Sequence, residues 1–104
     1  MEAVIVFITA PSREEAEAIG RHLVEMKLAA CANIVPGAQS IFFWQNKLCV
    51  ENEALIVLKT KRSLFEPLCN AVKEKHSYTV PEIIAVPVIE GAQPYLQWVE
   101  ENTL

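Results

Sequence analysis

The sequence lacks several features that mark common functional classes. It has only three glycines, and none of them forms a glycine-rich phosphate loop. The G-x-S-x-G and H-E-x-x-H motifs of hydrolases are also missing. Its densest apolar run, residues 3–8, is far shorter than the roughly 20 residues of a membrane-spanning helix. We therefore expect a protein that has no membrane partner and is not an enzyme of these classes.

Cysteine and positive charge are also scarce. The three cysteines stand apart with no C-x-x-C pair, so we expect free thiols rather than a disulfide framework. A formal net charge of −4 gives no electrostatic footprint for nucleic acid. The N-terminus has no basic stretch before its apolar run, which is not typical of a signal peptide. These observations favour a cytoplasmic protein with no nucleic-acid partner.

Apolar side chains are abundant instead. They make up 52% of the 104 residues, while charged residues make up only 21%. Typical soluble domains have about 45–50% and 25% respectively, and a chain of this length has room for one domain. We therefore expect a single domain over residues 1–104 with more apolar surface than a small core requires.

The hydrophobic pattern predicts strands alternating with helices. A β-branched first segment with no alternation is typical of a central strand buried on both faces. Capping boxes at Ser12–Glu15 and Ser63–Glu66 predict two helix starts, and Pro67 is tolerated near the first turn of the second helix. The expected elements are strand 3–9, helix 12–28, extended segment 29–37, hairpin arms 40–44 and 50–61 around a tip at 45–47, helix 63–75, strand 83–89 and a short helix from Pro94.

This order predicts an α+β fold of the ferredoxin-like kind, β-α-β-β-α-β, with a short C-terminal helix. Its antiparallel sheet would carry two helices on one face. Pro87 cannot donate to a sheet ladder and places the last strand at an edge. Residues 4–8, 41–44 and 55–58 are apolar on both faces, which two helices cannot cover. We therefore predict an obligate homo-oligomer.

A few residues are candidates for chemistry. Cys31 and His76 could pair as nucleophile and base, although a cysteine in an apolar strand is more typical of a core. His76 ends a helix and opens a loop that contains Tyr78 and Glu82, which makes it a candidate metal ligand. Lys59 ends an apolar strand and needs a partner, for which Glu53, Glu82 and a subunit junction are the candidates.

Five segments stand out by their order and spacing along the chain: Ile8-Thr9-Ala10-Pro11, Leu28-Ala29-Ala30-Cys31-Ala32-Asn33-Ile34, Ser40-Ile41-Phe42-Phe43-Trp44, Leu58-Lys59-Thr60 and Pro81-Glu82-Ile83-Ile84. Through these segments the chain as a whole resembles the CutA family of divalent-cation tolerance proteins. The resemblance implies a ferredoxin-like subunit, a homotrimer built through strand pairing, a cytoplasmic location and a likeness in fold to PII signalling proteins. The cofactor that it implies is a divalent metal, with copper the usual candidate.

The resemblance also implies site residues and shows departures. The family's polar set maps onto an inter-subunit cleft made of Cys31, Asn33, Glu53, Lys59, Tyr78 and Glu82. Members with a copper site are similar in having a cysteine and paired histidines where this chain has Ile8, Lys75 and His76. The usual His-Pro-Tyr is replaced by His76-Ser77-Tyr78, and the usual Glu-Gly-Lys by Gln45-Asn46-Lys47. Of that copper set only His76 remains, so the expected binding is a weaker one by His76 with acids of a neighbouring subunit, and His76 and Glu82 are the predicted metal contacts.

Three hypotheses follow for function. The first is a homotrimer that binds divalent metal and contributes to metal tolerance. The second is a PII-like signalling module whose inter-subunit clefts hold a small anionic ligand, with Lys59 as the counter-charge. The third is an enzyme that uses Cys31 or Tyr78. We predict the first, and no catalytic activity.

Overall fold

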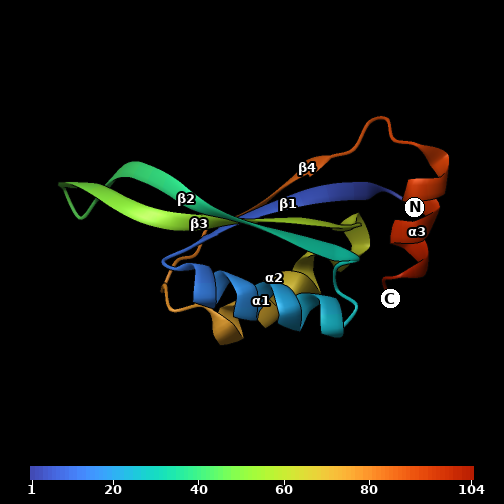
Figure 1. Cartoon of the computed structure of the whole chain (residues 1–104), viewed down its shortest axis with the longest axis horizontal. Helices are drawn as coiled ribbons and strands as arrows, with labels where there is room; N and C mark the ends of the chain where they lie inside the picture. Colours follow the sequence, from blue (N-terminus) through green and yellow to red (C-terminus); the bar gives the residue numbers. More distant parts are fainter.

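Four strands and three α-helices follow one another along the chain, and a computed structural model describes all 104 residues. The sheet is antiparallel with the order β2-β3-β1-β4, so the fold is α+β as predicted. Helices α1 and α2 cover one face of the sheet, and α3 lies beside its end near the N-terminus (Figure 1). The elements are β1 (Ala3–Ala10), α1 (Arg13–Glu25), β2 (Cys31–Trp44), β3 (Lys47–Lys61), the 3-10 turn η1 (Arg62–Leu64), α2 (Phe65–Lys75), β4 (Ile83–Pro87) and α3 (Gln93–Glu101).

Strand β1 is central, as predicted, because it pairs with β3 on one side and β4 on the other. The prediction that both of its faces are buried is wrong within one chain. Val4, Val6 and Ile8 are buried beneath the helices, whereas Ile5 and Phe7 on the opposite face are only half-buried. The reason is that both covering helices lie on the same side of the sheet. We call the opposite side the open face.

The two predicted capping boxes have different outcomes. At the start of α1 the Ser12 side chain accepts a hydrogen bond from the Glu15 backbone N–H at 3.1 Å, as predicted. The Glu15 carboxylate, however, contacts a distant loop instead of returning to Ser12. At α2 the prediction is wrong: Ser63 lies inside η1, and no side chain caps the helix. The chain leaves β3 through this tight turn, which moves the start of α2 to Phe65.

Strands β2 and β3 form a long hairpin whose outer part extends beyond the helices (Figure 1). Its tip consists of Gln45 and Asn46, with φ of 51° and 64°, and Lys47 already pairs with Trp44. Two consecutive positive φ values match the twist that a two-residue hairpin turn needs. The predicted Pro-Gly bend in β2 is a bulge, because the pairing register shifts between Val35 and Ala38.

The C-terminal elements follow the prediction with shorter bounds. Strand β4 pairs only with β1 and is therefore an edge, but it ends at Pro87 rather than residue 89. Helix α3 has its proline in the first turn, where the missing N–H costs no helical bond. After α3, the Leu104 backbone N–H donates to the Lys27 carbonyl oxygen at 3.0 Å, which fixes the C-terminus beside the end of α1. None of the helices is long and apolar enough to cross a membrane.

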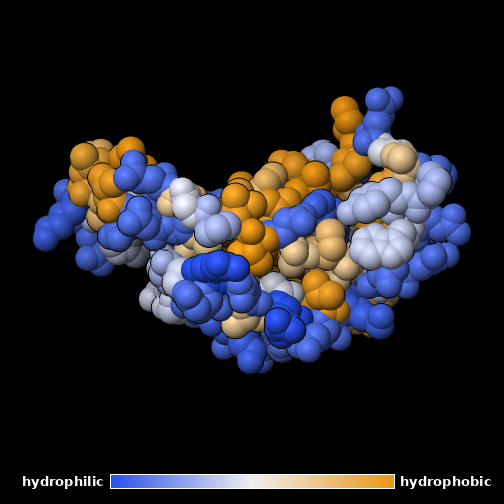
Figure 2. All heavy atoms as spheres, viewed as in Figure 1, coloured by the Kyte–Doolittle hydropathy of each residue, from blue (hydrophilic) through white to orange (hydrophobic).

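Apolar side chains gather in two separate places. Fifteen buried residues from β1, α1, β3 and α2, together with the segment before β2, form one core between the helices and the sheet. Outside the core, the outer hairpin exposes four large apolar side chains on one face, which we call the arm patch. Its members are Ile41, Phe43, Leu48 and Val50, and they are 55–73% exposed. Figure 2 shows apolar atoms at the end of the hairpin, separated by polar ones from those over the sheet.

Candidate functional site

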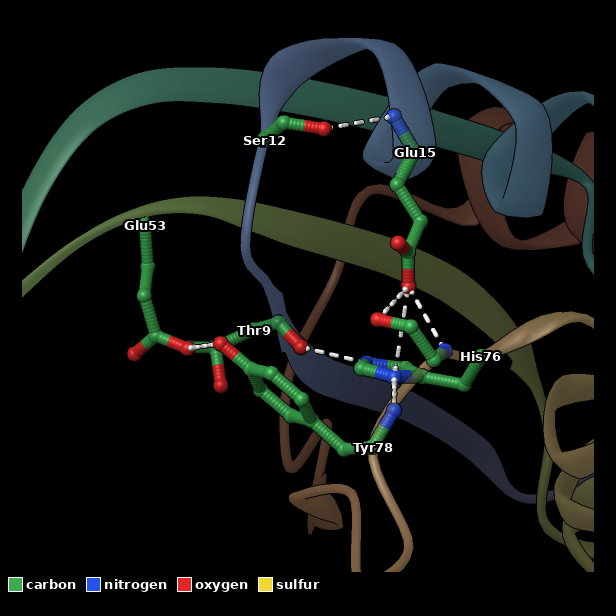
Figure 3. A network of polar contacts seen from close by, with 7 residues as sticks. Thr9, Ser12, Glu15, Glu53, His76 and Tyr78 are labelled. Atoms are coloured by element: carbon green, nitrogen blue, oxygen red, sulfur yellow. Dashed lines mark hydrogen bonds and ion pairs between the residues drawn. The ribbon is translucent and has the colours of Figure 1, made fainter.

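The loop after α2 begins with a histidine whose ring is fully enclosed. One ring nitrogen of His76, Nε2, lies 2.7 Å from the Thr9 carbonyl oxygen, and the other, Nδ1, lies 3.0 Å from the Tyr78 backbone nitrogen. A backbone N–H can only donate, so Nδ1 accepts and Nε2 carries the hydrogen that is donated to Thr9. Both nitrogens of the neutral ring therefore have partners within the same chain (Figure 3).

The Glu15 carboxylate attaches the same loop to the first turn of α1. Its Oε2 atom accepts hydrogen bonds from the Ser77 backbone N–H at 2.8 Å and from the Ser77 hydroxyl at 2.9 Å. The same oxygen lies 3.4 Å from Nδ1 of His76. A proline at position 77 could make neither Ser77 bond, because it has no N–H and no hydroxyl. The serine thus adds two contacts between the loop and the helix.

Tyr78 connects this loop to the hairpin. Its hydroxyl donates to Oε2 of Glu53 at 2.7 Å, and Glu53 is only 8% exposed although it forms no ion pair. Burial, the Glu53 hydrogen bond and the negative charges of Glu53, Glu51 and Glu15 raise the pKa of Tyr78 well above its ordinary value. The phenol therefore stays protonated at neutral pH and acts only as a donor to the carboxylate.

A second polar group lies on the open face, where β2 meets β3. The Lys59 ammonium donates to the side-chain oxygen of Asn33. The predictions of Glu53 or Glu82 as its partner within the chain are wrong, because the register places Cys31 opposite Lys59 and Asn33 two pairs further along, on the same face of the sheet. Asn33 is neutral, so the positive charge of Lys59 has no carboxylate partner in the chain.

Helix α3 completes this second group. The Tyr95 hydroxyl lies 3.6 Å from Sγ of Cys31, and burial together with that contact raises the pKa of Tyr95. A cavity of about 200 Å³ opens beside them, lined by Lys59, Tyr95, Leu96 and residues of β1 and the loop after β4. No hydrogen bond joins Cys31 to His76, whose ring nitrogens have other partners. The nucleophile-base pair is therefore not formed.

Within one chain the predicted cleft residues form two separate groups. Cys31, Asn33 and Lys59 lie together on the open face, whereas Glu53 and Tyr78 lie together at the hairpin. Glu82 is exposed and forms no hydrogen bond or ion pair. No group of three or more His, Cys, Asp and Glu side chains is placed to hold a metal ion. The inter-subunit cleft and the metal contacts at His76 and Glu82 stay predictions, because they concern residues of several chains.

Sequence reasoning missed the roles of four residues in these two groups of polar contacts: Thr9, Glu15, Ser77 and Tyr95. Thr9 acts through its carbonyl oxygen, which leaves no signature in the sequence. The capping-box pattern predicts Glu15 as a partner of the helix cap, because its position in the first turn fits that role equally well. Ser77 carries a usable signal, because it is one of the positions at which the sequence departs from the pattern of the family that it resembles. Tyr95 lies 64 residues from Cys31 in the chain, and no local pattern could link them.

Comparison with known proteins gives consistent results over nearly the whole chain. The family model described as "CutA1 divalent ion tolerance protein" matches residues 4–102. A divalent-cation tolerance protein CutA from Thermus thermophilus is 50% identical over 99 residues, which cover 95% of this chain and 96% of the relative. The chloroplastic protein CutA of Arabidopsis thaliana is 42% identical over 97% of this chain. The matched region covers only 56% of the length of that relative.

Solved structures agree in fold. The crystal structure of CutA1 from Oryza sativa superimposes with a TM-score of 0.97 at 38% sequence identity. The alignment covers 100% of this chain and 95% of the rice chain. The names of the relatives from Thermus thermophilus and Archaeoglobus fulgidus describe tolerance to divalent cations rather than a catalysed reaction.

Proposed function

Because the chain belongs to the CutA1 family of divalent ion tolerance proteins, we propose that it acts in tolerance to divalent cations as a cytoplasmic homotrimer and not as an enzyme. The subunit is a ferredoxin-like fold in this proposal, which the strand order β2-β3-β1-β4 and the two helices on one face support. The whole proposal depends on assembly, since the chain alone holds no metal centre.

The observation that carries the proposal is the apolar surface that the chain leaves uncovered. The arm patch is 55–73% exposed, and Ile84 and Val86 on the open face are 52% and 40% exposed. Apolar surface of this extent is typical of protein interfaces rather than of monomers. Strands β2 and β4 are also unpaired edges of the sheet, so copies of the chain can extend one another's sheets. A second and third copy of this chain are the occupants that we propose.

Sedimentation equilibrium tests the assembly directly. A homotrimer has three times the 11.6 kDa mass of the chain. We expect that mass at micromolar concentration, with little dependence on salt because the proposed contacts are apolar. A mass of one chain across that range would overturn the proposal.

The proposed metal contacts need ligands from more than one chain. His76 does not fit a copper centre as it stands, because both ring nitrogens are engaged and the ring is buried. Glu82 is exposed and free to contact a cation together with groups of a neighbouring subunit. We therefore place divalent-cation binding at Glu82 in the trimer, with His76 taking part only after it gives up a partner.

Calorimetric titration of the trimer with Cu²⁺ and with Zn²⁺ tests this placement. We expect Glu82→Gln to weaken binding by about tenfold, the scale of one lost charged contact. Glu25→Gln removes an exposed carboxylate from the last turn of α1 and should leave the titration unchanged. Equal binding by both variants would remove Glu82 from the site.

The second candidate function is a PII-like module that binds a small anion. The observation in its favour is Lys59, which lines a cavity of about 200 Å³ together with Glu90 and whose ammonium has only a neutral amide as its partner. Its charge is therefore available to an anionic ligand, and neighbouring subunits could close the cavity into a cleft.

A thermal-shift screen of small anionic metabolites separates the two candidates. A ligand present at 100 times its dissociation constant stabilises the native state by about 2.7 kcal/mol. That shift should disappear in Lys59→Met and persist in Lys73→Met, which removes an exposed charge from α2. If no anion stabilises the wild-type protein, the binding-module function is excluded for the anions screened.

A further inference from the structure

The hairpin consists of two parts with different support. Strand β1 ends at Ala10, which pairs with Ala54, so up to that point β3 has neighbours on both sides. Residues 38–53 continue as two strands alone, and we call this part the arm. An isolated two-stranded hairpin is marginally stable in water. The arm therefore needs something other than the sheet to hold its direction.

A bulge lies where the arm begins. Val35 pairs with Leu55 and Ala38 pairs with Glu53, so Pro36 and Gly37 stand opposite Ala54 alone. Gly37 has a φ of +85°, a conformation that side chains rarely adopt. Bulges bend the strand and increase its local twist. The arm thus leaves the sheet at a bend, and Glu53 is the arm residue of β3 that lies nearest to the body of the sheet.

The loop after α2 is fixed to the body at two points. The His76 ring donates to the Thr9 carbonyl oxygen at the end of β1 and accepts from the Tyr78 backbone N–H. Ser77 donates twice to Glu15 at the start of α1. Because its neighbours are held in this way, the Tyr78 side chain has little freedom to change direction.

From this fixed loop, Tyr78 reaches the arm. Its hydroxyl donates to Glu53 Oε2, and in Figure 3 the two side chains point toward each other from the loop and from β3. No other side chain donates to the Glu53 carboxylate, and Glu53 as a residue is only 8% exposed. Loss of the Tyr78 hydroxyl would leave the carboxylate of this mostly buried residue without its donor. Such a group draws water in or moves outward, and either response frees the arm at its bend.

We propose that the Tyr78–Glu53 contact is a clasp that sets the direction of the arm relative to the body, and that both residues are positioning residues for association with a second copy of the chain. The inference rests on the proposed assembly, because the arm carries the exposed arm patch that other copies would cover. The clasp itself lies within one chain, so it can be tested whether or not assembly occurs.

Hydrogen exchange in Tyr78→Phe is the decisive experiment. The variant keeps the ring and removes only the hydroxyl. We expect backbone amides of residues 38–53 to exchange about tenfold faster, the factor that corresponds to one hydrogen bond to a charged group. Amides of residues 55–60 should keep their wild-type rates, since β1 still supports them. Tyr95→Phe is the matched control, because it removes the other tyrosine hydroxyl at the opposite end of the sheet.

Sedimentation of the same variants shows whether the clasp serves assembly. We expect the assembly of Tyr78→Phe to dissociate at a protein concentration at least about tenfold higher than the concentration at which the wild-type assembly dissociates. Glu53→Gln keeps an acceptor oxygen for the hydroxyl and should retain most of the wild-type behaviour, whereas Glu53→Leu should behave like Tyr78→Phe.

The outcomes separate the clasp from the assembly. Unchanged exchange in the arm of Tyr78→Phe would overturn the clasp, even if the wild-type protein is a trimer. Faster exchange with no change in association would overturn the positioning role. A monomeric wild-type protein would remove the proposed assembly, while the exchange comparison would still decide whether the clasp exists.

Discussion

The body of the sheet and the arm differ in what covers them, although the same two strands run through both. In the body, even-numbered residues of β3 such as Ile56 and Leu58 are fully buried under the helices. In the arm, Leu48 and Val50 on the same strand are 62% and 55% exposed. The side chains are chemically alike, so the difference arises from the position of α1 and α2 rather than from composition.

This contrast shows that apolar content alone does not identify the core. The 52% of apolar residues includes one set buried within the chain and another that one chain cannot bury. The first set stabilises the fold, and in our proposal the second stabilises the assembly. Substitutions that are matched in chemistry but placed in different regions can test that division.

The largest effect is expected from Leu58→Ala in the body. Leu58 is 0% exposed, and removal of such a core side chain costs about 2–5 kcal/mol of unfolding free energy. The same substitution at Leu48 in the arm should cost less than about 0.5 kcal/mol if the arm patch stays in water, and more than that in the assembly that we propose, in which another copy covers the patch. Denaturant unfolding at one protein concentration measures both. A large loss at Leu48 would show that another copy covers the arm.

A somewhat smaller effect is expected from Phe43→Asp, and it should appear in association. Phe43 is 73% exposed in the chain, and burial of a phenylalanine contributes about 1.5–3 kcal/mol. We expect sedimentation to show smaller species for this variant. Ile89→Asp is the control, because Ile89 is 90% exposed in the loop after β4 and outside the arm. Equal dissociation by both variants would mean that the arm patch has no special role.

A further prediction compares the starts of the two helices that cover the body. It separates the contribution of a capping hydrogen bond from that of apolar burial under the helices. Ser12→Ala removes the acceptor for the Glu15 backbone N–H and should cost about 1 kcal/mol. Ser63→Ala should change the unfolding free energy by less than about 0.5 kcal/mol, because Ser63 is exposed and caps no helix. Thermal unfolding of the two variants gives the comparison. A loss of the same size at Ser63 would contradict the different roles of the two serines.

The sequence alone predicts the elements of the body well, because their signals are local. Strand β1, the start of α1 at Ser12 and the end of α2 at Lys75 agree with the predicted bounds or lie close to them. The Ser63 cap fails because the motif cannot show that a 3-10 turn intervenes before the helix. Short motifs predict the local hydrogen bond only when the backbone enters the helix directly.

The candidate site is predicted as a set of residues but not as an arrangement. Glu53 and Tyr78 were both named, yet their contact depends on a loop held by Thr9 and Glu15, which lie more than 60 residues away from it in the chain. The charge of Lys59 predicts a carboxylate partner, whereas the strand register supplies Asn33. Long-range packing decides such partners, and one sequence carries little information about it.

The smallest effect is expected from ionisation of the two tyrosines. It leaves stability unchanged at neutral pH and acts on the arm and the body separately at high pH. The pKa of Tyr78 and that of Tyr95 are raised in the folded protein from the ordinary value of 10. The folded state therefore holds these protons more tightly than the unfolded state, and the resulting stability is complete below pH 10 and declines as the pH rises above it. Tyr78 at the arm should ionise at the higher pH, because it donates to the Glu53 carboxylate while Tyr95 faces only the Cys31 thiol.

Ultraviolet titration of Tyr95→Phe and of Tyr78→Phe follows each tyrosine alone, since the chain has only two. We expect the single tyrosine of Tyr95→Phe to titrate after that of Tyr78→Phe, and the arm amides to lose protection from hydrogen exchange in the same pH range as Tyr78 ionises. This range lies above the one in which Tyr95 titrates, so the arm and the body should respond to alkali in separate steps. If Tyr78 instead ionises near pH 10 with the arm still protected, its hydroxyl does not hold the arm, because a phenolate cannot donate to a carboxylate.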